Sequence, residues 1–129
     1  MNDLIEVKTA ELTRLALDWA VARALGFVDY PEDSVEQGAW WYTDPLKAPF
    51  GERIYKADWK PSTDWRQGGP LVEGYAVSLE TRPGDGWLAQ VRGCQTATAD
   101  LTPLMAVCRA VVVAKLGDIV NVPAYLVRP

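Results

Sequence analysis

The sequence predicts an α+β protein in which two main helices pack on one face of a small antiparallel sheet made of two hairpins. Apolar residues recur at helical spacing over residues 10–25 and again over 103–116. Between these segments, short alternating stretches are separated by residues that favour turns. The predicted order is therefore helix, two strands, turn-rich connector, two strands, helix, with the helices covering one side of the sheet. The whole chain, residues 1–129, has the length of a single domain.

The first predicted helix runs from about residue 10 to residue 25. Thr9 is its predicted N-cap, and Glu11 places a negative charge in the first turn, where the helix dipole favours it. Gly26 supplies the end of the helix. The residues at three- and four-residue spacing on the predicted buried face are Leu12, Leu15, Ala16, Trp19 and Ala22. The residues expected outside this face are Arg14, Asp18 and Arg23.

The first hairpin is predicted from AWWYT at 39–43 and ERIYK at 52–56, after an acidic, turn-rich stretch at 30–38. Trp40 and Trp41 are adjacent in this hairpin, and successive side chains of a strand point to opposite faces of the sheet. At least one of the two rings should therefore face solvent, a partner or a ligand.

Residues 61–74, PSTDWRQGGPLVEG, are predicted to form a connector of short turns. Ser62 is expected to cap one turn that ends at Gly68, and Pro70 to begin another at its favoured first position. Gly74 then leads the chain into a strand.

The second hairpin is predicted from YAVSLE at 75–80 and GWLAQVRG at 86–93, joined by the turn residues TRPGDG. Thr102 as N-cap and Pro103 as the first helical residue open the last helix, which Gly117 ends. This helix is apolar on nearly all sides, so it should be largely buried or share a second face with another copy of the chain. The tail VNVPAYLVRP is expected to pack as an extended edge.

Composition excludes several classes of function. The net charge of −4 argues against binding to duplex nucleic acid, which is driven by basic surface. No apolar run is long enough to span a bilayer and the N-terminus lacks the pattern of a signal peptide, so we expect a cytoplasmic protein. With two cysteines and no histidine, neither a zinc site nor a histidine-dependent nucleophile is expected, and the cysteines should be reduced, buried thiols. No cofactor is predicted.

Carboxylate pairs leave one enzymatic alternative open, a metal-dependent hydrolase or nuclease. The pairs to consider are Glu32 with Asp33, Asp58 with Asp64, and Glu73 with Glu80. None has a spacing that brings the two carboxylates together within a regular element. Such an enzyme would need acidic residues that converge in one cleft and hold a divalent ion.

The connector also holds the candidate ligand site. Its residues are Asp64, Trp65, Arg66, Gln67, Gly68 and Gly69. The two glycines lack the third glycine of a dinucleotide loop and the lysine of a P-loop. They indicate either backbone freedom at positive φ or a small anion-binding nest beside Arg66. A Trp and an Arg together suit a nucleotide-like ligand, because bases stack on aromatic rings.

Two other interpretations remain. In one, Trp40 or Trp41 anchors a protein partner through an apolar patch. In the other, the motif is purely structural: Trp65 is an enclosed plug that fixes the connector to the core, and the last helix forms a homo-oligomer contact. Full enclosure of the Trp65 ring would support the structural interpretation.

Three stretches together resemble the NinX-like family of small phage and prophage proteins. They are KTAELTRLALDWAVARALG at 8–26, PSTDWRQGGPLVE at 61–73 and LTPLMAVCRAVVVAKLGDIVNVP at 101–123. The segment EQGAWWYTDPLKAPFGERIYK at 36–56 and the longer N-terminus depart from the family pattern, so the resemblance does not extend to Trp40 and Trp41. It implies a phage or prophage accessory protein that acts inside the host cell. Our leading hypothesis is a non-catalytic binding module for a host or phage protein or a small nucleotide-like ligand.

Overall fold

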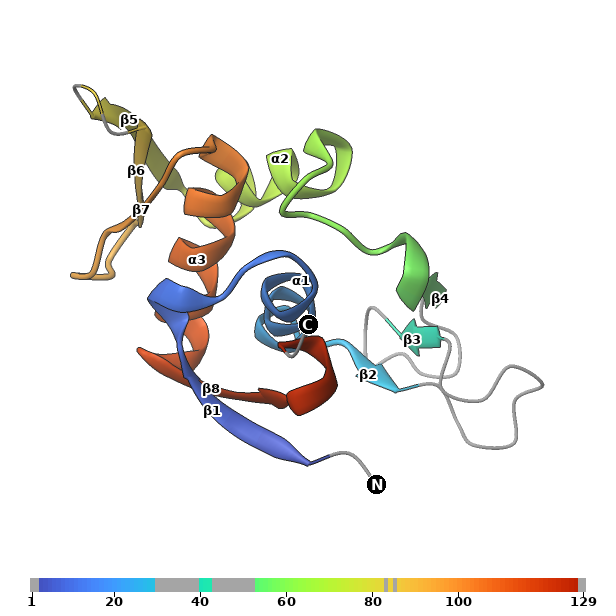
Figure 1. Ribbon diagram of the computed structural model, residues 1–129. Helices are drawn as coiled ribbons and strands as arrows, with labels where there is room; N and C mark the ends of the chain where they lie inside the picture. Colours follow the sequence, from blue (N-terminus) through green and yellow to red (C-terminus); the bar gives the residue numbers. More distant parts are fainter. Residues whose placement is uncertain (1–2, 30–39, 43–52, 83, 85, 128–129) are drawn as a thin grey trace.

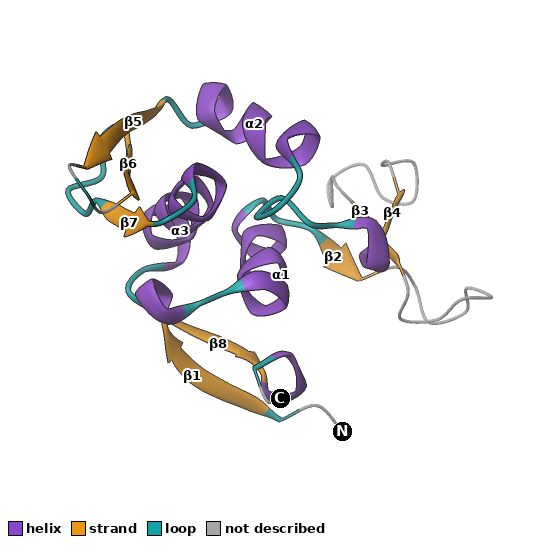
Figure 2. Cartoon of the chain, turned by 45° about the horizontal axis from the view of Figure 1, so that its top comes forward, coloured by secondary structure: helices purple, strands orange, loops and turns teal. Residues whose placement is uncertain are grey.

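The computed structural model describes residues 3–29, 40–42, 53–82, 84 and 86–127. Within them, the α-helices α1 (Arg14–Ala24) and α3 (Pro103–Leu116) lie at the centre, and α2 (Trp65–Gly74) packs on α3 at the edge of the molecule. Small antiparallel sheets surround the helices (Figures 1 and 2). The strands are β1 (Leu4–Lys8), β2 (Val28–Asp29), β3 (Trp40–Tyr42), β4 (Arg53–Tyr55), β5 (Val77–Arg82), β6 (Gly86–Val91), β7 (Thr98–Asp100) and β8 (Ile119–Pro123). Single 3-10 turns occupy Thr9–Glu11, Lys56–Asp58 and Ala124–Leu126.

The α+β class and both hairpins are confirmed, because β3 pairs with β4 and β5 with β6, each antiparallel. The single sheet is wrong. The hairpins belong to separate three-stranded sheets, in the orders β2-β3-β4 and β5-β6-β7. Helix α2 intervenes between the two hairpins, so each one adds a different third strand. α3 covers the β5-β6-β7 sheet, while α1 packs on α3.

The two ends of the described chain pair with each other. β1, which was not predicted, runs antiparallel to β8 with Leu4 opposite Pro123 and Lys8 opposite Ile119. The extended tail is therefore confirmed as a strand, β8, after which the chain makes a 3-10 turn.

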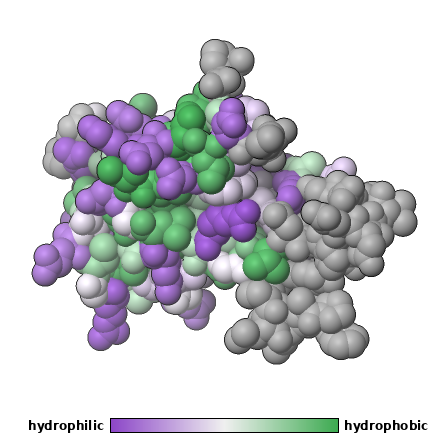
Figure 3. Space-filling model, turned by 90° about the horizontal axis from the view of Figure 1, so that it is seen from below, coloured by the Kyte–Doolittle hydropathy of each residue, from purple (hydrophilic) through white to green (hydrophobic). Residues whose placement is uncertain are grey.

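The face of the molecule seen from below carries apolar side chains in several groups among hydrophilic ones (Figure 3).

Helix α1 begins four residues later than predicted. Thr9 is not its N-cap: the Thr9 hydroxyl donates to the Gly117 carbonyl at 2.6 Å and the Thr9 amide to the Asp118 carbonyl at 2.8 Å. Thr9 thus ties the start of the chain to the residues just after α3. The buried face is also rotated from the predicted one, since Leu15 is 64% exposed and Asp18 is buried.

One continuous helix, α2, replaces the predicted pair of turns in the connector. Asp64, not Ser62, is its N-cap, and the Asp64 carboxylate accepts a hydrogen bond from the Arg66 amide at 2.9 Å. Pro70 lies inside the helix rather than at the start of a second turn. The strand β5 then begins at Val77, after Gly74 has ended the helix.

Helix α3 matches its prediction closely. Thr102 caps it by accepting the Met105 amide at 3.2 Å, Pro103 is the first residue, and Gly117 ends it at φ +94°. Most of its length is buried within the chain itself. The buried residues of α3 are Leu104, Ala106, Val107, Cys108, Arg109, Ala110, Val111, Val112 and Val113.

Candidate functional site

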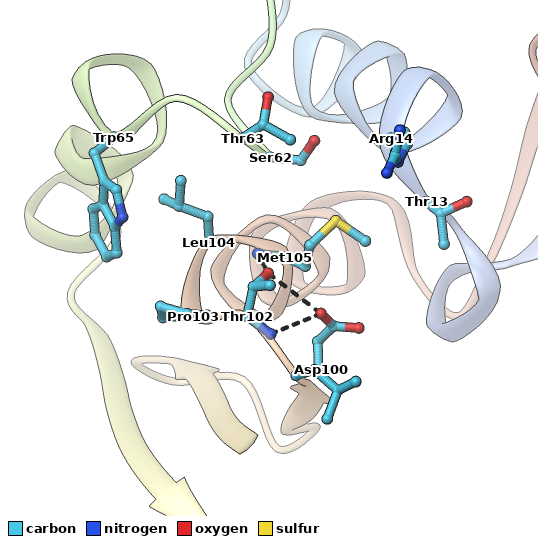
Figure 4. Close-up of a pocket in the computed structure, with 11 residues that line it drawn as sticks. Thr13, Arg14, Ser62, Thr63, Trp65, Asp100, Thr102, Pro103, Leu104 and Met105 are labelled. Carbon is cyan, nitrogen blue, oxygen red and sulfur yellow. Dashed lines mark hydrogen bonds between the residues drawn. The ribbon is translucent and has the colours of Figure 1, made fainter. Parts of the chain in front are cut away.

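A cavity of about 530 Å³ opens beside Trp65, at the meeting point of the three helix N-termini. Thr13 and Arg14 come from the start of α1, Ser62 and Thr63 precede α2, and Leu104 belongs to the first turn of α3. The close-up shows Trp65 at one side and Arg14 at the other, with Leu104 and Met105 between them (Figure 4). Apolar side chains therefore form the middle of the cavity, while hydroxyl groups and a guanidinium lie around it.

Trp65 is the predicted ligand residue that the structure places in this cavity. It is the first residue of α2 and is 53% exposed. The interpretation of Trp65 as an enclosed plug is wrong. An indole that fixes a loop onto a core would be enclosed, whereas about half of Trp65 faces solvent. The ring leaves a large aromatic surface open to a second planar group.

The neighbouring side chains of the motif act within the protein. The Gln67 side chain accepts the Lys60 amide through Oε1 at 2.6 Å and donates from Nε2 to the Asp58 carbonyl at 2.7 Å. Gln67 thereby fastens α2 to the segment before it. The side chain of Arg66 is 94% exposed, and its Nε lies 3.9 Å from Asp64 Oδ1, so it points into solvent outside the cavity lining.

Gly68 and Gly69 are helical, and neither has a positive φ. The Gly68 amide donates to the Asp64 carbonyl at 2.8 Å, so it already has an acceptor and does not form a free anion nest. The reason for glycine here is close approach: a Cβ on Gly68 would overlap the Pro61 carbonyl oxygen and lie 2.7 Å from Leu104 Cδ2. Gly68 lets α2 sit against α3, and this contact closes one wall of the cavity.

Arg14 supplies the free positive charge of the cavity. Within the described residues it has no ion pair or hydrogen bond through its side chain. Its backbone has φ +46°, which is uncommon for a residue with a side chain and marks local strain. Thr13, which precedes it, makes no side-chain capping bond to α1. The N-terminus of α1 is thus uncapped where it borders the cavity, and helix N-termini attract negative charge.

The acid of the cavity is already paired. Asp100 Oδ1 lies 2.8 Å from Arg109 Nη1, and its Oδ2 accepts the Thr102 amide at 3.0 Å. Because this carboxylate is held by two donors, it does not cancel the charge of Arg14.

A buried acid supports the cavity from behind. Asp18 on α1 accepts the Ser62 amide at 2.8 Å, and the Asp18 carbonyl accepts the Trp59 indole N–H at 2.9 Å. Burial raises the pKa of the Asp18 carboxyl above its ordinary value, and the hydrogen bond from the Ser62 amide opposes that rise. Asp18 fixes the segment before α2 onto α1.

The predicted partner anchors lie elsewhere. Trp41 is only 4% exposed. The centroid of its ring lies 6.1 Å from the centroid of Phe27 and 5.2 Å from Lys56 Nζ. The prediction of Trp41 as an anchor is therefore wrong, since the ring fills a second, smaller core cluster with Phe27 and Ala22. The side chain of Trp40 lies outside the described residues.

Acidic residues do not converge in the described part of the chain, which contains no group of three or more histidine, cysteine, aspartate or glutamate residues suited to a metal ion. Glu73 and Glu80 are both exposed, and the pair Glu32 and Asp33 lies outside the described residues. Both cysteines are free thiols. Cys94 is half-buried, while Cys108 is buried, and burial followed by the nearby Asp18 charge raises its pKa.

Sequence reasoning missed most of this cavity. It treated Thr102 and Pro103 only as the start of a helix, and it placed Arg14 on the outer face of a longer helix. A signal was present, because each helix is preceded by polar residues suited to an N-terminus, at Thr13, Asp64 and Thr102. Which N-termini meet in space depends on the packing of α2 and α1 against α3.

Together, the fold and the cavity define a small α+β protein with three helix N-termini around a surface cavity. None of the helices in the described residues has the length and apolar character needed to cross a bilayer. The family model of bacteriophage P22 NinX matches residues 8–115, and the chain belongs to that family. Among curated proteins, no sequence matches the chain. The family match includes α1, α2 and α3 up to residue 115, and hence the start of every helix that borders the cavity.

Proposed function

We propose that this NinX-family protein is a non-catalytic binding protein of the phage that acts in the host cytoplasm and takes a small nucleotide-like ligand in the cavity beside Trp65. The observation that carries the proposal is the half-exposed Trp65 ring on the rim of a cavity of about 530 Å³. Cavities of a few hundred Å³ with apolar walls and a few polar groups are typical sites for small molecules.

The two sides of the cavity match the two parts of such a ligand. A base stacks on Trp65, an interaction worth about 1–3 kcal/mol. A phosphate lies at the uncapped N-terminus of α1, where the Arg14 guanidinium and the backbone amides donate to it. Thr13 offers a hydroxyl group to the sugar between them, while the Thr63 and Thr102 hydroxyls already donate to the Lys60 carbonyl and to Asp100 Oδ2 and offer only an acceptor oxygen. In this account Asp64, Gln67, Gly68 and Gly69 hold Trp65 in place, and Arg66 adds positive charge nearby.

A thermal-shift screen against nucleotides, cyclic nucleotides and divalent ions tests the proposal. A ligand at one hundred times its Kd stabilises the folded protein by about 2.7 kcal/mol, so a nucleotide should raise Tm clearly. Stabilisation by a divalent ion alone, with no response to nucleotides, would contradict it and favour the metal-dependent hydrolase.

Matched variants assign the effect to this cavity. Trp65→Ala should weaken nucleotide binding by about 5- to 150-fold, the equivalent of the stacking energy. Tyr125→Ala is the control, because Tyr125 is also exposed, at 62%, and does not line the cavity. Arg14→Gln should weaken binding of a nucleoside monophosphate more than binding of the nucleoside, whereas Arg82→Gln on β5 should leave both unchanged.

A protein partner is the second candidate, and Leu101 favours it. This side chain is 78% exposed at the same cavity as Trp65, and an exposed apolar pair of this kind is common at the centre of protein contacts. Leu101→Ser would then abolish retention of the partner by the immobilised protein. Loss of nucleotide binding alone in Trp65→Ala would favour the first candidate.

A further inference from the structure

A second cavity, of about 460 Å³, lies between the start of the chain and the end of α3. It shares no lining residue with the cavity beside Trp65 among those described. Its walls are mostly apolar and include Ala10, Ala97, Ala99, Val113 and Ile119. The lining also includes Arg109, a cation from the middle of α3. The other polar residues of the lining are Lys8, Thr9, Thr96, Thr98 and Asp118.

Arg109 is 6% exposed, and its guanidinium makes three hydrogen bonds within the described residues. Nε donates to the Leu12 carbonyl at 3.0 Å, and Nη1 donates to the Ala99 carbonyl at 3.1 Å and to Asp100 Oδ1 at 2.8 Å. A guanidinium has five N–H groups, so these bonds use three and leave the two on Nη2. Nη2 makes no hydrogen bond within the part of the chain that the structure describes.

The hydroxyl groups of the same wall do not compensate for this. The Thr98 hydroxyl donates to the Ala106 carbonyl at 2.8 Å, and the Thr9 hydroxyl donates to the Gly117 carbonyl at 2.6 Å. Neither hydroxyl therefore has a proton left to donate to a ligand. Lys8 and Asp118 lie at the exposed rim with opposite charges. The unpaired edge of Arg109 is therefore a buried donor inside the cavity, whereas Lys8 and Thr96 are exposed at its rim.

We propose that this second cavity binds a small molecule with an apolar body and one carboxylate. The carboxylate accepts a charge-assisted hydrogen bond from Arg109 Nη2, the nitrogen that the three bonds within the protein leave over. Asp100 occupies the Nη1 side of the same guanidinium, so Arg109 is shared between the two carboxylates. The alanine, valine and isoleucine side chains of the walls take the apolar body. This proposal does not depend on the nucleotide site, because the two cavities have separate linings.

Amide NMR spectra of the full chain, titrated with benzoate and with benzamide, test the proposal. Benzoate should cause saturable shifts at Ala97, Ala99 and Ile119, and benzamide should bind at least about tenfold more weakly, because it lacks the charge that a guanidinium prefers. Absence of saturation at millimolar benzoate, equal affinity for benzamide, or shifts confined to the Trp65 cavity would overturn the proposal.

Two variants locate the site. Arg109→Lys, if its spectrum keeps the dispersion of a folded protein, should weaken benzoate binding at least about tenfold, because an ammonium has three N–H groups and the bonds within the protein already need three. Ala97→Trp provides an independent route: Ala97 is exposed at the cavity, so a larger ring blocks the entrance without touching the Arg109 bonds. The control is Ala57→Trp, at another exposed alanine remote from the cavity lining. Unchanged benzoate binding in Ala97→Trp would refute the assignment.

Discussion

α2 approaches α3 closely at Gly68, and the distances there predict how a larger residue at this position changes the free energy of unfolding. In an open helix, Gly→Ala stabilises by up to about 1 kcal/mol, because alanine has the higher helix propensity. At Gly68 the new methyl group would overlap the Pro61 carbonyl oxygen and lie 2.7 Å from Leu104 Cδ2. The carbonyl is backbone and cannot rotate away, so α2 must shift, and overpacking of this kind costs about 1–3 kcal/mol. We expect Gly68→Ala to lower the free energy of unfolding by about 1–3 kcal/mol.

Gly69→Ala is the matched control one residue along the same helix. Its Cβ would lie 3.4 Å from Trp65 Cε3, an ordinary contact, so helix propensity should dominate and this variant should be equal to or more stable than the parent. Urea unfolding followed by circular dichroism measures both free energies, with unchanged m values as the check on two-state behaviour. If Gly68→Ala proved as stable as Gly69→Ala, the close packing of α2 on α3 would be refuted.

Three further predictions concern other positions. Ala76 has φ +50°, so Ala76→Gly should raise the free energy of unfolding by about 0.5–1 kcal/mol in urea; a decrease would contradict the left-handed backbone. Trp41→Ala should lower that free energy by about 3–5 kcal/mol in thermal unfolding, whereas a surface anchor would lose almost nothing. Because burial raises the Asp18 pKa above 3.8, the folded state binds the proton more tightly, and stability falls as pH rises from the ordinary value through the raised one. Asp18→Asn should remove this loss, at most about 1.4 kcal/mol per pH unit, and a wild-type pH profile in the variant would argue against it.

Local signals were sufficient for the elements that local chemistry determines. Thr102, Pro103 and Gly117 fix both ends of α3, since capping, a fixed φ and a positive φ each depend on one residue and its neighbours. The β5-β6 hairpin likewise follows from alternation and a turn between the strands. These predictions survive because no distant contact competes with them.

The elements that were predicted wrongly depend on contacts between residues that are far apart in the sequence. Thr9 has the chemistry of an N-cap, yet its hydroxyl bonds to Gly117 on the far side of the chain, and α1 begins later. Asp18 has the polarity of a surface residue, yet the Ser62 amide gives it a buried partner. β1 becomes a strand because β8 is there to pair with it. In each case the partner lies more than forty residues away along the chain.

The candidate cavity likewise combines a residue that the sequence indicates with residues that only tertiary packing brings beside it. Trp65 was predicted from the sequence as a ligand residue, and its exposure depends on where α2 places it. Arg14 and the residues before α3 join it only through tertiary packing. Trp41 is buried, and sequence alone could not predict this, because alternation in a strand says only that two adjacent rings do not both point inward.

The indole N–H signals in a titration with adenosine monophosphate test the central claim most directly. We predict that the Trp65 signal shifts with saturation, that the Trp41 signal stays in place, and that Arg14→Gln weakens the response. A Trp65 signal that no nucleotide displaces, in a protein that remains folded, would contradict the assignment of the cavity.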